Sequence, residues 1–228
     1  MPEKKDAKAN VYYPVFLNVK GRDCIVIGGG NVAYRKVVTL LEDGAKVTVI
    51  SPEMAPELAN LAEQKKIKVR DREYLKGDLA GVFVAIAATD SSIINHQIAE
   101  EAREKSVLVN VVDDAEFSDF IAPSIVRRGD ITFAISTAGQ SPALARKLRT
   151  RLESVFGEEY GSLGKVLGEV RAEAKKQNIT VDGDGWQEAI DLDLILALIK
   201  KGDEAKAKKT VLDNLRAKQI TKLKNSDG

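Results

Sequence analysis

Cysteine and histidine are nearly absent from this chain of 228 residues, which contains one of each, Cys24 and His96. A single cysteine excludes an internal disulfide framework and a zinc site built from cysteines. A single histidine excludes a multi-histidine metal centre and disfavours a catalytic triad that depends on histidine. We therefore predict no metal site made of side chains, a core position for Cys24 and a surface or capping role for His96. The chemistry of the chain then has to use a cofactor, carboxylates, hydroxyls or cationic side chains.

Neither an excess of charge nor a long apolar run is present. Lysine and arginine number 35 against 34 acidic residues, a formal net charge of +1, which is unlike a protein that binds nucleic acid in bulk. The longest apolar run, residues 82–88, is far shorter than the roughly 20 residues that span a bilayer. The polar residues 1–5 do not resemble a signal peptide. We expect a soluble, cytoplasmic globular protein with no nucleic-acid or membrane partner.

Short apolar runs alternate with amphipathic helical patterns in the first half of the chain. Apolar residues at helical spacing follow the runs at residues 24–27, 46–50 and 82–88. Strands that are apolar on both faces and separated by helices predict a parallel sheet covered on both sides. Residues 12–113 are therefore predicted to form a doubly wound α/β domain, with strands at 24–27, 46–50, 67–69, 82–88 and 107–109.

The pattern changes after residue 114. Two strands are predicted over residues 120–130 and 131–136, joined at Gly129-Asp130. Ser141 and Pro142 are typical of the N-cap and first position of a helix, which we expect to reach about Phe156. The rest of the chain is predicted to be helical, with one helix beginning at Asp184-Gly185. The lysine-rich tail over residues 200–228 is interpreted as a solvated helical face.

The predicted strand pair has no obvious partner strand in its own chain. Unpaired strand edges favour pairing across subunits, so we predict a homodimer. The chain then divides into three expected parts: the doubly wound α/β domain at residues 1–113, a small dimerisation segment at 114–145 and a helical C-terminal domain at 146–228.

The glycines after the first predicted strand indicate a nucleotide site. Gly28-x-Gly30-x-x-Ala33 lies between a strand and a helix, the spacing that suits a dinucleotide pyrophosphate. The helix N-terminus there offers free N–H groups and a partial positive charge. The alternative, a merely structural glycine turn, explains the spacing less well.

The end of the second predicted strand is where a ribose-binding acid is expected. Ser51-Pro52 stands there with Glu53 just beyond, so either the Glu53 carboxylate or the Ser51 hydroxyl can hold the adenosine ribose. No arginine is present at this place to receive a 2′-phosphate. The sequence therefore favours NAD over NADP.

Asp113 follows the fifth predicted strand at the sheet edge where open α/β folds bind ligands. Its carboxylate can accept a proton while hydride leaves to a nicotinamide, although an acid that caps the next turn would occupy the same position. A second candidate is the cationic stretch of residues 127–151, with Arg127, Arg128 and Arg146. It is either a solvated surface or, beside the helix start at Ser141, a cleft for a polyanionic substrate.

Five motifs follow one another over about residues 12–155. They are Gly28-Gly29-Gly30-Asn31-Val32-Ala33-x-Arg35-Lys36, Ala87-Ala88-Thr89-Asp90, Asn110-Val111-Val112-Asp113, Pro123-Ser124-Ile125 and Ser141-Pro142-Ala143-Leu144-Ala145-Arg146. Together they closely resemble the precorrin-2 dehydrogenase/sirohydrochlorin ferrochelatase family, of the siroheme synthase N-terminal type. Beyond residue 157 only a generally helical character is shared.

The resemblance implies an NAD-binding Rossmann domain, a segment that interlocks two subunits, and two reactions. The first is the NAD-dependent oxidation of precorrin-2 to sirohydrochlorin. In bifunctional members ferrous iron is then inserted to give siroheme, whereas some relatives perform only the oxidation. The sequence leaves the choice between these two kinds of member open.

The resemblance also assigns roles to single residues. The family's catalytic aspartate falls on Asp113, and its dinucleotide contacts fall on Gly28, Gly30, Asn31 and Val32, with Pro52 and Glu53 near the adenosine and Thr89 by the loop after the fourth strand. Asn31 departs from the family pattern, which often has aspartate there. A tetrapyrrole bearing eight carboxylates is expected to favour Arg127, Arg128, Ser141 and Arg146 as substrate contacts, and its own nitrogens would ligate the iron.

A protein of a different class remains a rival. Non-catalytic NAD-sensing modules also join a Rossmann domain to a dimerising segment. They need no carboxylate at Asp113 and no cationic cleft, and they usually keep an acid at the end of the second strand. Binding of a tetrapyrrole is the property that separates the two hypotheses.

Overall fold

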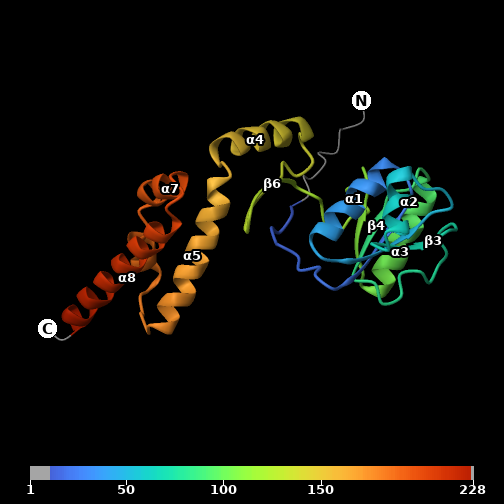
Figure 1. Ribbon diagram of the computed structural model, residues 1–228. Coiled ribbons are helices and arrows are strands. Elements are labelled where there is room, and N and C mark those ends of the chain that lie inside the picture. Colours follow the sequence, from blue (N-terminus) through green and yellow to red (C-terminus); the bar gives the residue numbers. More distant parts are fainter. Residues whose placement is uncertain (1–10, 227–228) are drawn as a thin grey trace, which may run out of the picture. The chain divides into compact units, whose positions relative to one another are not determined.

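The structure, a computed structural model, describes residues 11–226 and divides the chain into two compact units, Met1–Ala122 and Pro123–Gly228 (Figure 1). The polar residues 1–5 and the last two residues of the lysine-rich tail lie outside the described range. Within that range, no helix combines the length and apolar character that crossing a bilayer requires.

The first unit alternates strands and helices. Its elements are β1 (Asp23–Ile27), α1 (Asn31–Glu42), β2 (Lys46–Ile50), α2 (Pro56–Glu63), β3 (Lys68–Arg70), β4 (Val84–Ala87), α3 (Ser92–Lys105) and β5 (Leu108–Val111). All five predicted strands are present within two residues of their expected bounds. Val82 and Phe83 precede β4 because the N–H of Val82 bonds to Leu79 O in a turn.

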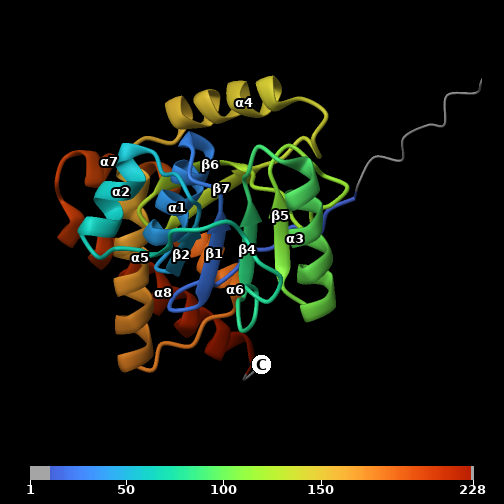
Figure 2. The ribbon, with the colours of Figure 1, turned by 90° about the vertical axis from the view of Figure 1, so that its right-hand side faces the viewer.

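The five strands form one parallel sheet in the order β3-β2-β1-β4-β5, and β2, β1, β4 and β5 lie side by side in Figure 2. Alternate residues of the strands pack on opposite faces, as the pleat requires. Val26, Val49 and Ile86 pack with α1 and α2 in one cluster, whereas Ile25 and Val109 pack with α3 in the other. The prediction of a doubly wound sheet with apolar faces on both sides is confirmed.

The register of the sheet places the ends of its central strands level with one another. Ile27 pairs with Ile50 on one side and with Ala87 on the other, and Ala87 pairs in turn with Val111. Because these strands are parallel, the residues that follow them emerge at one edge. That edge is the place where open α/β sheets bind their ligands.

The second unit begins with a strand pair and continues as helices: β6 (Ser124–Arg128), β7 (Ile131–Ile135), α4 (Pro142–Val155), α5 (Glu159–Lys176), α6 (Gly183–Ala189), α7 (Leu192–Lys200) and α8 (Glu204–Ser226). The strands are antiparallel and joined at Gly129-Asp130, as predicted. Ser141 is the N-cap of α4, with its hydroxyl 3.2 Å from the N–H of Leu144. Helices α5, α7 and α8 pack around Val170, Ile195 and Leu215 (Figure 1).

The start of α6 differs from the prediction. Its N-cap is Asp182, whose carboxylate accepts the N–H of Gly185 at 2.9 Å, so the helix begins at Gly183 rather than at Asp184-Gly185. Asp182 and Asp184 are each followed by glycine and have equal capping ability. The sequence offered no means of choosing between them.

Candidate nucleotide-binding site

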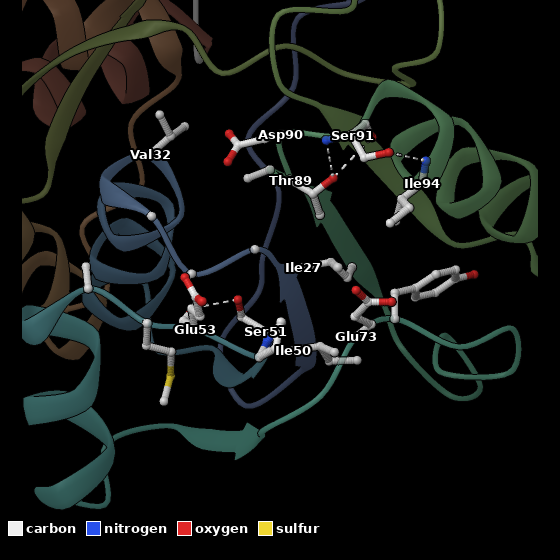
Figure 3. Close-up of a pocket in the computed structure, with 18 of the residues that line it drawn as sticks. Ile27, Val32, Ile50, Ser51, Glu53, Glu73, Thr89, Asp90, Ser91 and Ile94 are labelled. Atoms are coloured by element: carbon white, nitrogen blue, oxygen red, sulfur yellow. Dashed lines mark hydrogen bonds between the residues drawn. The ribbon is translucent and has the colours of Figure 1, made fainter.

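A pocket of about 760 Å³ opens at the carboxyl edge of the sheet in the first unit (Figure 3). It is lined by the ends of β1, β2 and β4, the starts of α1 and α3, and the segment that follows β3. Every residue predicted to contact the cofactor lines it: Gly28, Gly30, Asn31, Val32, Ser51, Pro52, Glu53 and Thr89. The sheet register explains this convergence, because the turns after three neighbouring strands emerge together.

The glycine turn after β1 leaves no room for side chains in two of its three positions. A Cβ on Gly28, whose φ is +122°, would lie 2.2 Å from Ala88 O, and a Cβ on Gly29 would lie 1.8 Å from Glu53 O. The motif did not single out Gly29, although the run of three glycines was a signal. A Cβ on Gly30 would meet no atom within 4 Å, so this glycine keeps space free for a ligand.

The first turn of α1 faces this free space. Gly30 is the N-cap of α1 and has no side chain with which to bond the first N–H groups of the helix. These N–H groups and the positive end of the helix dipole suit a phosphate. The glycine turn, which carries no side chains, and the uncapped start of α1 together fit a dinucleotide pyrophosphate.

The turn after β2 decides between the two candidate ribose contacts. The Ser51 side chain is nearly buried, with 7% of the residue exposed, and its hydroxyl donates to Glu53 O at 2.6 Å. Ala55 N–H bonds to Gly29 O at 2.8 Å and ties this turn to the glycine turn. Ser51 therefore shapes the turn, whereas the Glu53 side chain is exposed and remains accessible to a ligand.

The charge of the pocket lining bears on the choice of dinucleotide. Its carboxylates are those of Glu53, Glu73 and Asp90, and no lysine or arginine is among the described residues that line it. Ser51, Glu53 and Ile50 lie along one side of the pocket, with Thr89, Asp90 and Ser91 along the other (Figure 3). A 2′-phosphate near Glu53 would meet like charge, which favours NAD over NADP.

Thr89 belongs to a rigid loop between β4 and α3. Its hydroxyl donates to Asn95 Oδ1 at 2.8 Å, and Asn95 Nδ2 donates back to Thr89 O at 3.0 Å. Ser91 accepts the N–H of Ile94 at 3.4 Å as the N-cap of α3. Asn95 is nearly buried and was not predicted, since its partner is known only once the loop is folded.

Asp113 lies at the same sheet edge but is not among the residues that line the pocket. It occupies a tight turn in which Asp114 N–H bonds to Val111 O at 3.2 Å, and its φ is +60°, the left-handed region that non-glycine residues seldom adopt. Burial lowers the pKa of Lys36, Arg35 adds to the effect, and the charge of Asp113 opposes it. Lys36 is thus an electrostatic neighbour of Asp113 that the sequence analysis did not identify as a site residue.

His96 has specific partners next to Asp113. Its ring stacks on Phe117 at 3.8 Å between centroids, and Nε2 lies 3.0 Å from Asp114 Oδ2. The bond from His96 is the main cause that holds the pKa of Asp114 below its usual range. Ser118 bonds to both Val111 and Asp114. The single histidine therefore helps to fix the turn that carries Asp113.

The four residues predicted to contact the substrate lie in the second unit. Arg128 is 15% exposed and donates from Nε to Phe156 O at 2.8 Å and from Nη2 to Glu153 O at 3.2 Å. It therefore ties β6 to the end of α4, and Ser141 caps the start of that helix. Arg127 and Arg146 are exposed.

The fold and the pocket define the first unit as an NAD(P)-binding domain of the Rossmann type. Residues 15–124 match the family described as putative NAD(P)-binding, and residues 128–154 match the sirohaem biosynthesis protein central family. The solved structure of "SirC, precorrin-2 dehydrogenase" is 26% identical with a TM-score of 0.69, and the match covers 90% of this chain and 100% of that one.

Curated relatives carry the name siroheme synthase. The protein from Nitrosococcus oceani is 42% identical over 73% of this chain and 36% of its own length. The protein from Chromobacterium violaceum is 39% identical over 86% of this chain and 42% of its own length. The chain is thus similar to members of the precorrin-2 dehydrogenase/sirohydrochlorin ferrochelatase family, as its sequence indicates, and it spans less than half the length of these two relatives.

Proposed function

We propose that this protein oxidises precorrin-2 to sirohydrochlorin with NAD, as a step of siroheme biosynthesis. The observation that carries the proposal is the likeness to the SirC dehydrogenase, which extends over the whole of that chain. The glycine cradle at Gly28–Gly30 and the acid-lined pocket support NAD as the oxidant.

Different residues of the site bind the cofactor and accept the proton in such an oxidation. The reaction removes one hydride and one proton from the macrocycle, and bound NAD supplies the hydride acceptor. Gly28, Gly30 and the start of α1 hold the pyrophosphate, and Glu53 accepts hydrogen bonds from the adenosine ribose. The Asp113 carboxylate accepts the proton, a role that suits a carboxylate at the ligand edge of the sheet.

The same proposal includes how the substrate is bound and how the chain assembles. Precorrin-2 is polyanionic, so the exposed Arg127 and Arg146 are proposed to bind its carboxylates, whereas Arg128 and Ser141 hold the local structure for them. The division into residues 1–113, 114–145 and 146–228, the homodimer and the cytoplasmic location remain predictions.

The experiment is an anaerobic assay of precorrin-2 with NAD, in which NADH and sirohydrochlorin absorbance are both followed. Wild type is expected to form both products, and Asp113→Asn to slow the reaction by at least about 100-fold. Asp23→Asn, at the opposite end of β1, is the matched control and should keep the wild-type rate. A full rate in Asp113→Asn would refute the role of that residue, and no turnover by folded wild type would refute the function.

Ferrous iron insertion is the second candidate reaction, supported by the name siroheme synthase of the curated relatives. In this reaction Fe²⁺ is a substrate whose ligands come from the macrocycle, and Asp113 would receive the pyrrole protons. The test is anaerobic insertion of Fe²⁺ or Co²⁺ into sirohydrochlorin. A rate no higher than the spontaneous one would make this protein a dehydrogenase only, and failure to bind any tetrapyrrole would favour the NAD-sensing module.

A further inference from the structure

Tyr74 is the one aromatic side chain among the described residues that line the nucleotide pocket. It lies in the segment between β3 and β4, and it packs against the apolar cluster on the α3 face of the sheet. Neither the glycine motif nor the family resemblance assigned a role to this residue. An aromatic ring at the wall of a nucleotide pocket offers a stacking surface for a base.

Tyr74 packs in the same apolar cluster as Ile50, the residue that ends β2. The pyrophosphate cradle follows β1, and the ribose acceptor Glu53 follows β2, which is one strand further toward β3. Because Tyr74 and the end of β2 belong to one apolar cluster, we place Tyr74 at the adenosine half of the pocket. Ile50 and Ile94 also line the pocket and add apolar surface there (Figure 3).

A buried carboxylate that the proposed reaction does not use holds Tyr74 in place. The Glu101 side chain is 1% exposed, and it accepts hydrogen bonds from the Tyr74 hydroxyl, from Gly77 N–H at 2.9 Å and from Leu79 N–H at 3.2 Å. Lys105 Nζ lies 3.9 Å from its Oε1. Burial and the bond to Glu101 raise the pKa of Tyr74, so its hydroxyl stays a donor.

A second carboxylate fixes the same segment from the other side. Asp78 accepts Leu75 N–H at 2.9 Å and makes ion pairs with Arg70 at 2.6 Å and Arg72 at 2.7 Å. The side-chain bond from Arg72 is the largest cause that keeps the pKa of Asp78 low. The backbone around Tyr74 is therefore held at two points, which reduces the entropy lost when a ligand stacks on the ring.

We infer that Tyr74 is the base-binding wall of the adenine subsite and that Glu101 is its positioning residue. The ring of Tyr74 stacks on the purine of an adenine nucleotide, and Glu101 fixes the ring through the hydroxyl. This inference rests on the proposed binding of NAD in the pocket, and it is independent of what the second substrate is.

The test is the ratio of two dissociation constants, measured by fluorescence titration of the full chain with NADH and with its cytosine-containing analogue. Wild type is expected to bind NADH more tightly, because a purine offers more stacking surface than a pyrimidine. Tyr74→Leu should weaken NADH binding about tenfold and bring the ratio close to one. Tyr13→Leu, at an exposed tyrosine outside the pocket, is the matched control.

Positioning by Glu101 is tested with Tyr74→Phe, Glu101→Gln and the double variant, each checked for a cooperative thermal transition. Each single change should weaken NADH binding about threefold, and the loss in the double variant should be smaller than the combined losses of the two single variants, because both single changes remove the hydrogen bond between Tyr74 and Glu101. Fully additive losses would overturn the positioning role of Glu101. An unchanged NADH/cytosine ratio in Tyr74→Leu would overturn the role of Tyr74, whereas no NADH binding by wild type would overturn the NAD proposal itself.

Discussion

The three glycines after β1 meet different surroundings. Backbone oxygens stand where side chains on Gly28 and Gly29 would begin, whereas Gly30 faces open space. The first two glycines are therefore needed for the folded turn and the third for the ligand. Alanine substitutions can separate these two requirements.

Gly29→Ala is expected to destabilise the protein by about 1–3 kcal/mol, because its Cβ would force Glu53 and Ser51 away. Gly30→Ala should leave the free energy of unfolding within about 1 kcal/mol of wild type yet weaken NADH binding at least about tenfold. Urea unfolding and NADH titration measure the two effects. Equal behaviour of the two variants would contradict the assignment.

His96 gives the turn of Asp113 a pH-dependent support. The hydrogen bond from His96 lowers the pKa of Asp114, so it stabilises the folded state above the unfolded-state pKa of about 4. That contribution is lost as the pH falls through the lower folded-state value. The side chain of Asp114 is 31% exposed, so the effect is small.

His96→Phe keeps a ring to stack on Phe117 but removes the partner of Asp114. The variant is expected to be less stable than wild type at pH 7, with the difference shrinking as the pH falls below about 4. Urea unfolding of both proteins across this range measures it. A difference that stays constant with pH would show that Asp114 is not the cause.

At the scale of elements, the start of α4 depends on one hydroxyl. Ser141 accepts the N–H of Leu144, and Thr137 in turn bonds to the backbone of Ser141. Ser141→Ala should cost about 1 kcal/mol of stability, as measured by urea unfolding. Ser154→Ala, near the other end of the same helix, is the control and should change stability by less than about 0.5 kcal/mol.

The strands and helix starts were predicted correctly where local chemistry decides them. A buried strand such as β4 is a continuous apolar run, and Ser141 stands where an N-cap is expected. The start of α6 was wrong because two aspartates there have equal capping ability. Local signals of equal strength need tertiary contacts to separate them.

At the scale of the whole molecule, the unpredicted features join residues distant in sequence. Tyr74 and Glu101 are 27 residues apart, and His96 and Asp114 are 18 apart. Each pairing depends on the sheet order β3-β2-β1-β4-β5, which no local pattern encodes. The convergence on one pocket of the residues expected to contact the cofactor was predictable because they follow strand ends, whereas the residues that hold their surroundings were not.

The homodimer is a prediction at this scale as well. The described part of the second unit pairs β6 only with β7, and in the first unit the apolar Val15 and Phe16 are 65% and 76% exposed. Such surfaces favour association between subunits. Light scattering at micromolar concentration should give twice the chain mass of 24.8 kDa, and the mass of a monomer would contradict the prediction.

We propose that one chain couples the acid-lined NAD pocket to oxidation of a tetrapyrrole. The most direct measurement is the stoichiometry of an anaerobic single turnover, with enzyme in excess over precorrin-2 and NAD saturating. We expect one NADH for each sirohydrochlorin formed. Folded protein that binds NADH but forms neither product would contradict it.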